Sequence, residues 1–504
     1  MVEAIESPLG FVVLFLIFIM FLFLEGAMLF VGCVRPFFLF KNTYPKGKNE
    51  TKAKDCTSRN ADNLSVALTN FFDEKSISDL AKSTKFIQRK SKLCAMKFLT
   101  TLMFVHQQGK LLSLLDICGD LHIQHGLQVR KQSIQERFNE YAVAFMKAIL
   151  SRLLENQLKS TAVEKSLPFF NRIRIKDSTR YALPAAYTQI YKGHGGALAN
   201  SASMISIQYE YDLLSGSTLD LRLTTGTRND QRDAKENTHD IVENDLFIRD
   251  LGYSTLGYLS QIVKGKAYFL NRLNSQTAVY NVEDNEPIDF LKCKKKIKKY
   301  NLPYLQYDVS IGKDAQLPCR LIIYPADQNT YEKRVRQTTK YAKSCGLQVS
   351  EDFKCKAHLT LYITNVPEDK LPASAIKKTY GLRWQIELFF KIWKSQGNID
   401  KVKEMKLHRF ECQLMAKLIW LIIHWKIFCY LADHLKYNQK DKYCSVWKYY
   451  KHAFRINTMV RDIITKPDKL LILMLDLSNI ASNQFGLEEK KGKMAHYKTL
   501  KALA

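Results

Sequence analysis

Hydrophobic and polar positions divide the chain into a helical first part and a mixed second part. From about residue 65 to residue 160 the apolar residues recur at helical spacing, with an interruption at Gly126. Ser133 and Glu136 stand at the spacing of a capping box, which predicts that a helix begins there and continues through Phe145. The first part is therefore predicted to be entirely helical.

From Phe169 onward, short runs rich in β-branched and aromatic residues replace the helical spacing. In one of them Ile205, Ile207 and Tyr209 alternate with polar residues, as in a strand with one buried face. Strands are predicted at residues 172–177, 204–211, 219–225, 246–250, 267–273, 278–282, 305–311, 321–324 and 358–364. Helices are predicted at about residues 254–263, 331–345, 372–394 and 410–435. This element order predicts an α/β fold.

The first forty residues are unlike the rest. Residues 9–24 are uncharged and mostly apolar, Glu25 follows, and residues 26–34 are again uncharged. This length could span a bilayer, and the basic residues Arg35 and Lys41 would then leave the bulk of the chain in the cytoplasm. The alternative is foreign sequence, added by a start codon placed too far upstream. The apolar run 410–435 contains charged residues and is interpreted as buried core.

The charge of the chain indicates its partner. The 504 residues include 76 Lys and Arg against 49 Asp and Glu, a net charge of +27, which favours a polyanion. Arg130, Lys131 and Arg137 lie near the start of the helix predicted around Ser133. That region is either a helix-turn-helix-like DNA reader or a bundle with a basic, solvated face. The run 292–299 is either a phosphate-contacting patch or a solvated loop.

One segment places several reactive side chains on a single stripe. At about 100° per residue, Arg383, Glu387, Lys391 and Lys394 all fall within about 60° of Tyr380. The opposite side of the same helix is apolar and would anchor it: Leu382, Ile386, Phe389, Phe390 and Trp393. By geometry alone, Glu387 is either catalytic or simply paired with the basic residues at helical spacing.

Two further carboxylates are placed at predicted strand ends. Asp177 precedes Ser178 and Thr179, and Asp250 precedes a turn that leads directly into a helix. Carboxylates at the strand ends of an α/β sheet are common ligands of hard divalent cations. The alternative for each is a turn or a helix N-cap. In combination with Glu387, in this element order, they favour a three-carboxylate site.

These residues carry a family resemblance. The spacing Tyr380-x2-Arg383-x3-Glu387-x6-Lys394 resembles the YREK signature of bacterial insertion-sequence transposases with an RNase H-like DDE core. Asp177-Ser-Thr and Asp250-Leu-Gly-Tyr resemble the surroundings of that family's first and second catalytic Asp. The resemblance covers about residues 65–440, and the hydrophobic N-terminus departs from it.

The resemblance implies a mechanism. Asp177, Asp250 and Glu387 would hold two Mg²⁺ or Mn²⁺ ions for strand cleavage and transfer in cut-and-paste transposition. Tyr380, Arg383 and Lys394 would contact phosphates near the cleavage site, and Lys391 on the same stripe is also expected to bind DNA. The neighbouring Trp384 would either stack on an unpaired base or pack beside the site. Two rival readings stay open: a metal-dependent nuclease that never joins strands, and a membrane-tethered DNA-binding protein without catalysis.

The resemblance also implies the organisation of the chain and its partners. Expected partners are double-stranded DNA, as terminal inverted repeats and target, and a second copy of the chain in a synaptic homodimer. The expected location is the bacterial cytoplasm, or the inner membrane if residues 9–34 are an anchor. The expected fold is an RNase H-like mixed sheet, interrupted by a β-rich insertion and flanked by helical regions. The predicted segments are a hydrophobic segment 1–40, a linker 41–64, a helical DNA-binding domain 65–165, a catalytic core 166–266 and 371–440, the insertion 267–370, and a helical, charged region 441–504.

Overall fold

The computed structural model describes residues 68–89, 91–105, 112–155, 169–195, 202–236, 240–274, 276–313, 317–438, 443–466 and 470–487. The chain divides into two compact units, Met1–Lys52 and Ala53–Ala504, and all described residues lie in the second. The hydrophobic segment predicted at 1–40 and the linker predicted at 41–64 therefore lie outside the described residues.

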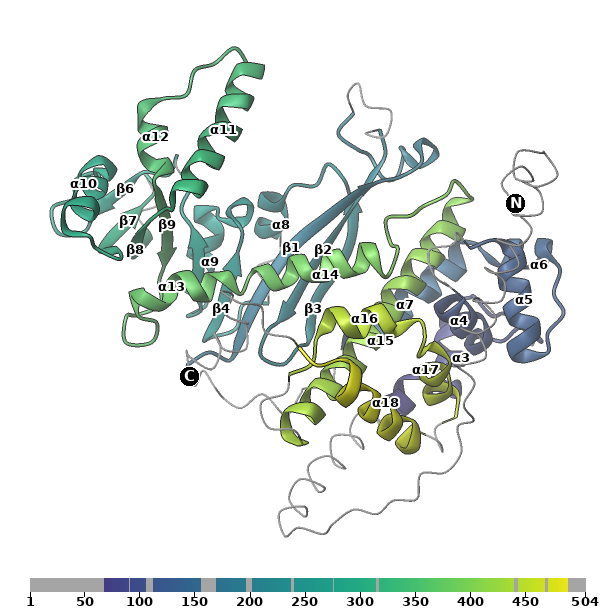
Figure 1. The fold of residues 1–504 in the computed structure, drawn as a ribbon. Coiled ribbons are helices and arrows are strands. Elements are labelled where there is room, and N and C mark those ends of the chain that lie inside the picture. The colour runs from purple at the N-terminus through teal and green to yellow at the C-terminus, as the bar shows by residue number, and fades with distance from the viewer. Residues whose placement is uncertain are drawn as a thin grey trace, which may run out of the picture. The chain divides into compact units, whose positions relative to one another are not determined.

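The described chain contains a nine-stranded mixed sheet (Figure 1). Its strands are β1 (Arg172–Ala182), β2 (Met204–Asp212), β3 (Thr218–Thr225), β4 (Asp245–Arg249), β5 (Tyr268–Arg272), β6 (Val279–Asn281), β7 (Leu305–Ile311), β8 (Leu317–Pro325) and β9 (Leu359–Thr364). They lie in the order β3-β2-β1-β4-β5-β9-β8-β7-β6. The pairs β1–β4 and β4–β5 are parallel, and the remaining neighbours are antiparallel. The predicted α/β class is confirmed.

The parallel strands lie between two hydrophobic cores. In β4 every residue is buried, as is usual for a parallel strand covered on both faces. Leu246 and Ile248 pack into one core, while Phe247 packs into another together with Phe269 of β5. The helices α8 (Asp230–Glu236) and α9 (Leu256–Lys264) flank this strand in the chain, with the short helix η2 (Leu251–Tyr253) between β4 and α9.

The lysine-rich run at 292–299 is a helix, α10 (Phe290–Tyr300), and not a loop. The carboxylate of Asp289 caps it by accepting hydrogen bonds from the backbone N–H groups of Leu291 and Lys292. Cys293 and Ile297, four residues apart, are buried and hold the helix against the protein. Two further helices, α11 (Gln328–Ser344) and α12 (Glu351–Ala357), follow β8.

Helices precede the sheet in the described part of the chain, among them α3 (Glu74–Ser83), α4 (Ala95–Phe104), α5 (Leu114–His125), α6 (Lys131–Arg137) and α7 (Glu140–Glu155). Aromatic rings hold them together, because Phe86 packs against Phe98 and Phe145 at centroid distances of 4.8 and 5.0 Å. The predicted break at Gly126 is confirmed, since this glycine ends α5 in a left-handed conformation.

The capping box predicted at Ser133 and Glu136 was wrong. Ser133 lies inside α6, which begins at Lys131 and ends at Arg137. A separate helix, α7, follows because the side chain of Asn139 accepts a hydrogen bond of 3.0 Å from the backbone N–H of Ala142.

After the sheet come α13 (Ala373–Gly381), α14 (Trp384–Ser395), α15 (Leu407–Asn438), α16 (Val446–Ala453), α17 (Asn457–Thr465) and α18 (Leu470–Gln484). Among the described residues, Leu407–Leu435 of α15 is the one stretch long and apolar enough to cross a membrane, with a mean hydropathy of 1.6. In this structure 78% of the apolar 18-residue window within this stretch is buried inside the protein. It packs against α7 and α4, as expected of a core helix.

The helix predicted at 372–394 is divided in two. Leu382 and Arg383 form a turn between α13 and α14, with hydrogen bonds of 3.0 Å from their N–H groups to the carbonyls of Thr379 and Tyr380. These tighter bonds replace the usual α-helical ones at the junction. The turn places Arg383 at the start of α14, where its side chain can reach the sheet.

Candidate active site

Asp177 and Asp250 lie side by side on neighbouring strands. The parallel pairing of β1 and β4 aligns Lys176 with Arg249, so the next residue on each strand is an aspartate. Neighbouring strands are about 4.8 Å apart, which brings the two carboxylates to one edge of the sheet. Asp250 follows β4 as predicted. Asp177, however, does not end its strand, because β1 continues to pair with β2 as far as Ala182.

Glu387, in the first turn of α14, faces the same place. A single guanidinium bonds two of the carboxylates: Arg383 Nη1 is 3.3 Å from Asp177 Oδ2, and its Nη2 is 2.5 Å from Glu387 Oε1. The hydroxyl of Tyr380 donates a hydrogen bond of 3.4 Å to Asp250 Oδ1. Tyr380, near the end of α13, and Arg383, at the start of α14, therefore contact all three predicted carboxylates between them.

An aromatic cluster fixes α14 on the sheet. Tyr209, which pairs with Asp177 across β1 and β2, lies 4.7 Å from the ring of Trp393 and 5.8 Å from Phe389. Phe389 also packs against Trp425 of α15 at 4.5 Å. Figure 1 shows α14 lying across β1 and β2. All five residues predicted for the anchoring face are buried: Leu382, Ile386, Phe389, Phe390 and Trp393.

Burial dominates the electrostatics of the site. It raises the pKa of Asp177 to about 6, against the opposing effects of the Ser178 N–H and the Arg383 guanidinium. The nearby carboxylates of Asp250 and Asp230 raise this pKa further. Burial also raises the pKa of Tyr380, so its hydroxyl keeps its proton and acts as a donor at neutral pH. The site therefore favours an added positive charge.

The raised pKa of Asp177 predicts a pH dependence of stability. Between about pH 4 and pH 6 the folded state binds more protons at this carboxyl than the unfolded chain, so stability falls as pH rises. The side chain is only 20% exposed, and a shift from 3.8 to about 6 corresponds to about 3 kcal/mol.

We expect Asp177→Asn, without divalent ions, to raise the free energy of unfolding by about 1–3 kcal/mol at pH 7. The substitution should change it little at pH 4, where the folded wild-type carboxyl is already protonated. Urea unfolding of both proteins at both pH values measures the effect, and equal stability at pH 7 would contradict the prediction.

Comparison with known proteins identifies the family. The sequence profile of the family described as "Transposase DDE domain" matches residues 168–423, about half of the chain, and includes all three carboxylates. The chain belongs to this DDE transposase family. It is therefore an enzyme that binds DNA and acts on it, in a family that generally uses divalent metal ions.

Named relatives of this DDE transposase agree with the profile. The transposase for insertion sequence element IS231E of Bacillus thuringiensis subsp. finitimus is 32% identical over 380 residues, which are 72% of this chain and 78% of the relative. The transposase for IS1151 of Clostridium perfringens is 31% identical over 378 residues, 71% and 79% of the two chains. A solved structure of the piggyBac transposase synaptic complex with hairpin DNA covers 85% of this chain at 10% identity, with a TM-score of 0.41.

The other residues that the sequence predicted on α14 differ in their relation to the candidate site. Lys394 points back to the sheet and donates a hydrogen bond of 3.1 Å to the carbonyl of Arg180 on β1. Trp384 is 61% exposed, so it does not pack beside the site as one reading expected. Lys391 lies over the ring of Trp447 in α16 at 5.0 Å, and this contact takes its ammonium group away from the carboxylates.

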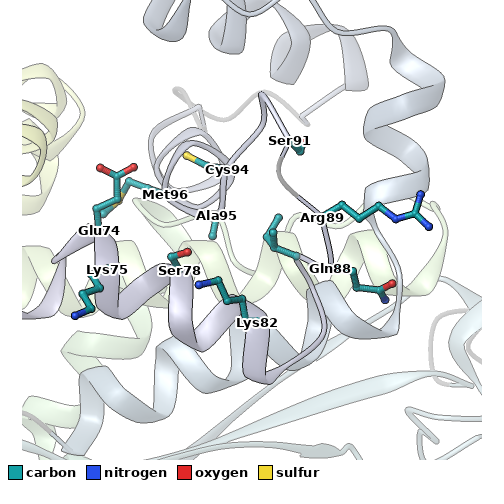
Figure 2. Close-up of a pocket in the computed structure, with 11 residues that line it drawn as sticks. Glu74, Lys75, Ser78, Lys82, Gln88, Arg89, Ser91, Cys94, Ala95 and Met96 are labelled. Carbon is teal, nitrogen blue, oxygen red and sulfur yellow. The ribbon is translucent and has the colours of Figure 1, made fainter.

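Arg130, Lys131 and Arg137 belong to a different part of the transposase. Arg130 and Lys131 are exposed at the start of α6. Arg137 Nη2 donates a hydrogen bond of 3.0 Å to Ser91 Oγ, and Ser91 lines a groove of about 490 Å³ beside α3 and the start of α4 (Figure 2). Other basic residues line the same groove: Lys75, Lys82 and Arg89.

Two residues of the site were not predicted from the sequence. Arg272 ends β5 one position beyond Asn271, which pairs with Arg249, so it is level with Asp250 on the next strand. Its guanidinium is half-buried and has no hydrogen-bond or ion-pair partner within the described part of the chain. Arg272 stands at the end of a predicted strand, as Asp250 does, and this position could have indicated it as a site residue.

Asp230 is the second such residue. It starts α8 and accepts hydrogen bonds from Ser178 Oγ at 3.0 Å and Arg180 Nη2 at 3.1 Å, on the face of β1 opposite to Asp177. Its carboxylate is still near enough to raise the pKa of Asp177. Gly252 allows this approach, because a Cβ there would stand 3.1 Å from Asp230 Oδ2. Nothing in the polar run around Asp230 distinguished it in the sequence.

Behind the aspartates, the opposite face of the sheet holds buried ion pairs. Glu210 of β2 accepts hydrogen bonds of 2.6 Å from both Arg174 of β1 and Arg249 of β4. Lys176 lies 2.7 Å from Asp233 of α8. These charged residues alternate with the residues that face α14. They connect the strands that carry Asp177 and Asp250.

Proposed function

We propose that Asp177, Asp250 and Glu387 form the catalytic centre of an insertion-sequence transposase that cuts the ends of its element and joins them to target DNA. The observation that carries this proposal is the meeting of three carboxylates, from β1, from the end of β4 and from α14, at Arg383 and Tyr380. A simple helix ion pair would explain Glu387 alone, but it would not explain two aspartates on adjacent parallel strands.

The donor set fits hard divalent cations. Carboxylate oxygens are the preferred ligands of Mg²⁺ and Mn²⁺, and the added charge would offset the repulsion felt by Asp177. Within the described residues no three acidic, His or Cys groups already stand at metal-ligating positions, because Arg383 lies between Asp177 and Glu387. Glu387, whose side chain is 39% exposed, has room to turn from Arg383 toward the aspartates.

When bound, two such ions supply an activated water and stabilise the leaving 3′-oxygen in phosphodiester cleavage. The protein residues bind and orient the strand. Arg383 has a buried Nε donor without a partner among the described residues, which suits a phosphate oxygen. We infer that Arg383, Tyr380, Lys394 and the unpaired Arg272 position the phosphates next to the scissile bond. The exposed ring of Trp384 offers a stacking surface for an unpaired base.

The fold supports the same proposal. In the half of the sheet that carries the aspartates, β2 and β3 are antiparallel to their neighbours while β1, β4 and β5 are mutually parallel. We infer from this mixed arrangement an RNase H-like core, with β9 lying in the sheet between β5 and the insertion strands β8, β7 and β6. The basic groove near Arg137, with Arg130 and Lys131, is proposed to contact the element ends. Synapsis of two ends would require a homodimer, and DNA as substrate favours a cytoplasmic location.

A joining assay tests this function. The purified protein is incubated with Mg²⁺ and a duplex that carries the inverted repeats flanking its gene, together with a supercoiled target plasmid. We expect metal-dependent cleavage at the repeat and covalent joining of the repeat end to the plasmid. Nicked products without joined ones would overturn the proposal in favour of a nuclease, and DNA binding without any cleavage would favour a purely binding protein.

A further inference from the structure

The insertion carries a helix with an unusually basic exposed side. In α11, Ala342 is the only residue that is fully buried. Four basic residues recur at intervals of three and four: Lys333, Arg336, Lys340 and Lys343. At about 100° per residue they fall within a sector of about 80°, which we call the α11 stripe. All four are exposed, and all four line one groove on the surface of the helix.

The α11 stripe has no acidic partner within the described residues. The helix contains one acidic residue, Glu332, which lines the same groove at the edge of the stripe, four positions before Arg336. Its carboxylate accepts a hydrogen bond from Gln328 and makes no ion pair with a stripe residue. Neighbouring stripe residues are three or four positions apart, so each of them repels the next along the helix. Like charges kept at this spacing disfavour the free helix. An anionic ligand laid along the stripe would remove that repulsion.

The helix that carries the α11 stripe is anchored on a strand next to the candidate active site. Arg334, in the first half of α11, donates a hydrogen bond of 2.7 Å to the carbonyl of Leu359 at the start of β9. In the same strand, the ring of Tyr362 lies 5.1 Å from that of Tyr380, whose hydroxyl bonds Asp250. Tyr362 is also the neighbour of Arg272 in the antiparallel register of β9 and β5. Arg334 lies about 140° around the helix from the centre of the α11 stripe, so α11 is anchored near the site by its other side and the stripe faces away from β9. A duplex that leaves the carboxylates past α11 would meet this basic side.

We propose that the α11 stripe binds the phosphate backbone of duplex DNA next to the cleavage site. This inference rests on the proposed function of Asp177, Asp250 and Glu387. From Lys333 to Lys343 the stripe is about 15 Å long, which matches roughly four base pairs of duplex. The duplex could be element DNA beside the cut or the target DNA, since both present the same phosphates. The experiment below separates them.

A second lysine-rich helix provides a matched control. The lysines of α10 at 292, 295, 296 and 299 form a similar exposed stripe, but α10 packs on α12 and β8. Two of its lysines already have neighbours, since Lys292 lies 3.9 Å from Asp289 and Lys299 lies over the ring of Tyr300. Neutralising α10 removes the same total charge from the same insertion without touching α11.

The test compares two fourfold variants with the wild type. One carries Lys333→Gln, Arg336→Gln, Lys340→Gln and Lys343→Gln, and the other carries Gln at the four α10 positions. Binding is measured as a function of salt, first to an element-end duplex and then to a plasmid captured by a pre-cleaved end complex. For the α11 variant we expect affinity for one of these DNAs to fall at least about tenfold near 0.15 M salt. The slope of log K against log salt should decrease by about 3 to 4, for four lost phosphate contacts.

The measurement in which affinity and salt slope change identifies the DNA that the stripe binds. A change with the element-end duplex indicates element DNA beside the cut, and a change with the plasmid indicates target DNA. Unchanged slopes in both arms, or an equal change in the α10 variant, would overturn the inference. The melting temperature should stay the same or rise, because like-charge neighbours are removed from an exposed helix. If the wild type fails to cut element ends, the proposed function is wrong. If it cuts them and the salt slopes of the α11 variant equal those of the wild type, only the inference about the α11 stripe is wrong.

Discussion

Replacing Glu387 by Gln is expected to lower the rate of element-end cleavage at least about 10³-fold, while the variant still binds the end. The same result is expected for Asp177→Asn and Asp250→Asn. Each substitution keeps the size of the side chain and removes one anionic ligand from the proposed metal site, where the ions would supply several kcal/mol of transition-state stabilisation. At about 1.4 kcal/mol per factor of ten, that loss corresponds to several powers of ten in rate.

The Glu387 variant should keep the local structure of the site. Glu387→Gln leaves an amide oxygen that can still accept a hydrogen bond from Arg383, so α14 should keep its place on the sheet. Cleavage of a labelled element-end duplex in Mg²⁺, with end binding measured by gel shift, gives both quantities. Glu283→Gln, an exposed substitution in the turn after β6, serves as the matched control and should cleave at the wild-type rate.

Cleavage near the wild-type rate in any of the three variants would remove that residue from the proposed site. Loss of cleavage together with loss of end binding would mean that the substitution disturbs the DNA-binding surface and not the chemistry alone. Mn²⁺ in place of Mg²⁺ should support cleavage by the wild type, because both ions prefer carboxylate oxygens.

Replacing Glu210 by Ala is expected to destabilise the protein by about 3–5 kcal/mol. Glu210 is 3% exposed, and its partners Arg174 and Arg249 are 4% and 1% exposed, so both guanidinium groups would be left buried without their shared carboxylate. Its arginines lower the pKa of Glu210 against the effect of burial. This contribution to stability is therefore present at neutral pH and is lost as the pH falls below the ordinary range of a carboxyl.

Urea unfolding at pH 7 measures the loss. Glu236→Ala is the control, because Glu236 bonds Arg228 and Arg232 in a comparable pair of contacts but its side chain is 45% exposed. Solvent screens such a pair, so its removal should change stability only slightly. A Glu210 variant as stable as the Glu236 variant would show that the buried ion pairs do not hold β1 and β4 together.

The two predictions concern opposite faces of the same strands. Arg249 directly precedes Asp250, and Lys176 directly precedes Asp177, so successive side chains point to opposite faces of the sheet. One face holds the ion pairs around Glu210, and the other presents the aspartates to α14. Because the register aligns Lys176 with Arg249, fixing these strands also fixes the spacing of the two aspartates.

The sequence by itself predicted the residues of the proposed site and, in outline, the elements that they occupy. The stripe of Tyr380, Arg383 and Glu387 and its apolar opposite side follow from helical periodicity, which depends only on residue spacing. The same holds for the run before Asp250, whose apolar residues predict a buried strand. Even there, Leu382 and Arg383 form a turn that the periodicity missed, because a break without Pro leaves no signal in apolar spacing.

The tertiary structure alone decided which distant residues meet. Strand pairing placed Asp177 beside Asp250 and brought Arg272 to the same edge, since hydrogen bonding between strands leaves no local mark in the sequence. Glu210 is on the polar side of the alternating run 204–211, which the pattern predicts to be exposed. It is buried because arginines from β1 and β4 neutralise it. Charge compensation and register are properties of the assembled sheet, and residue spacing along one strand does not contain them.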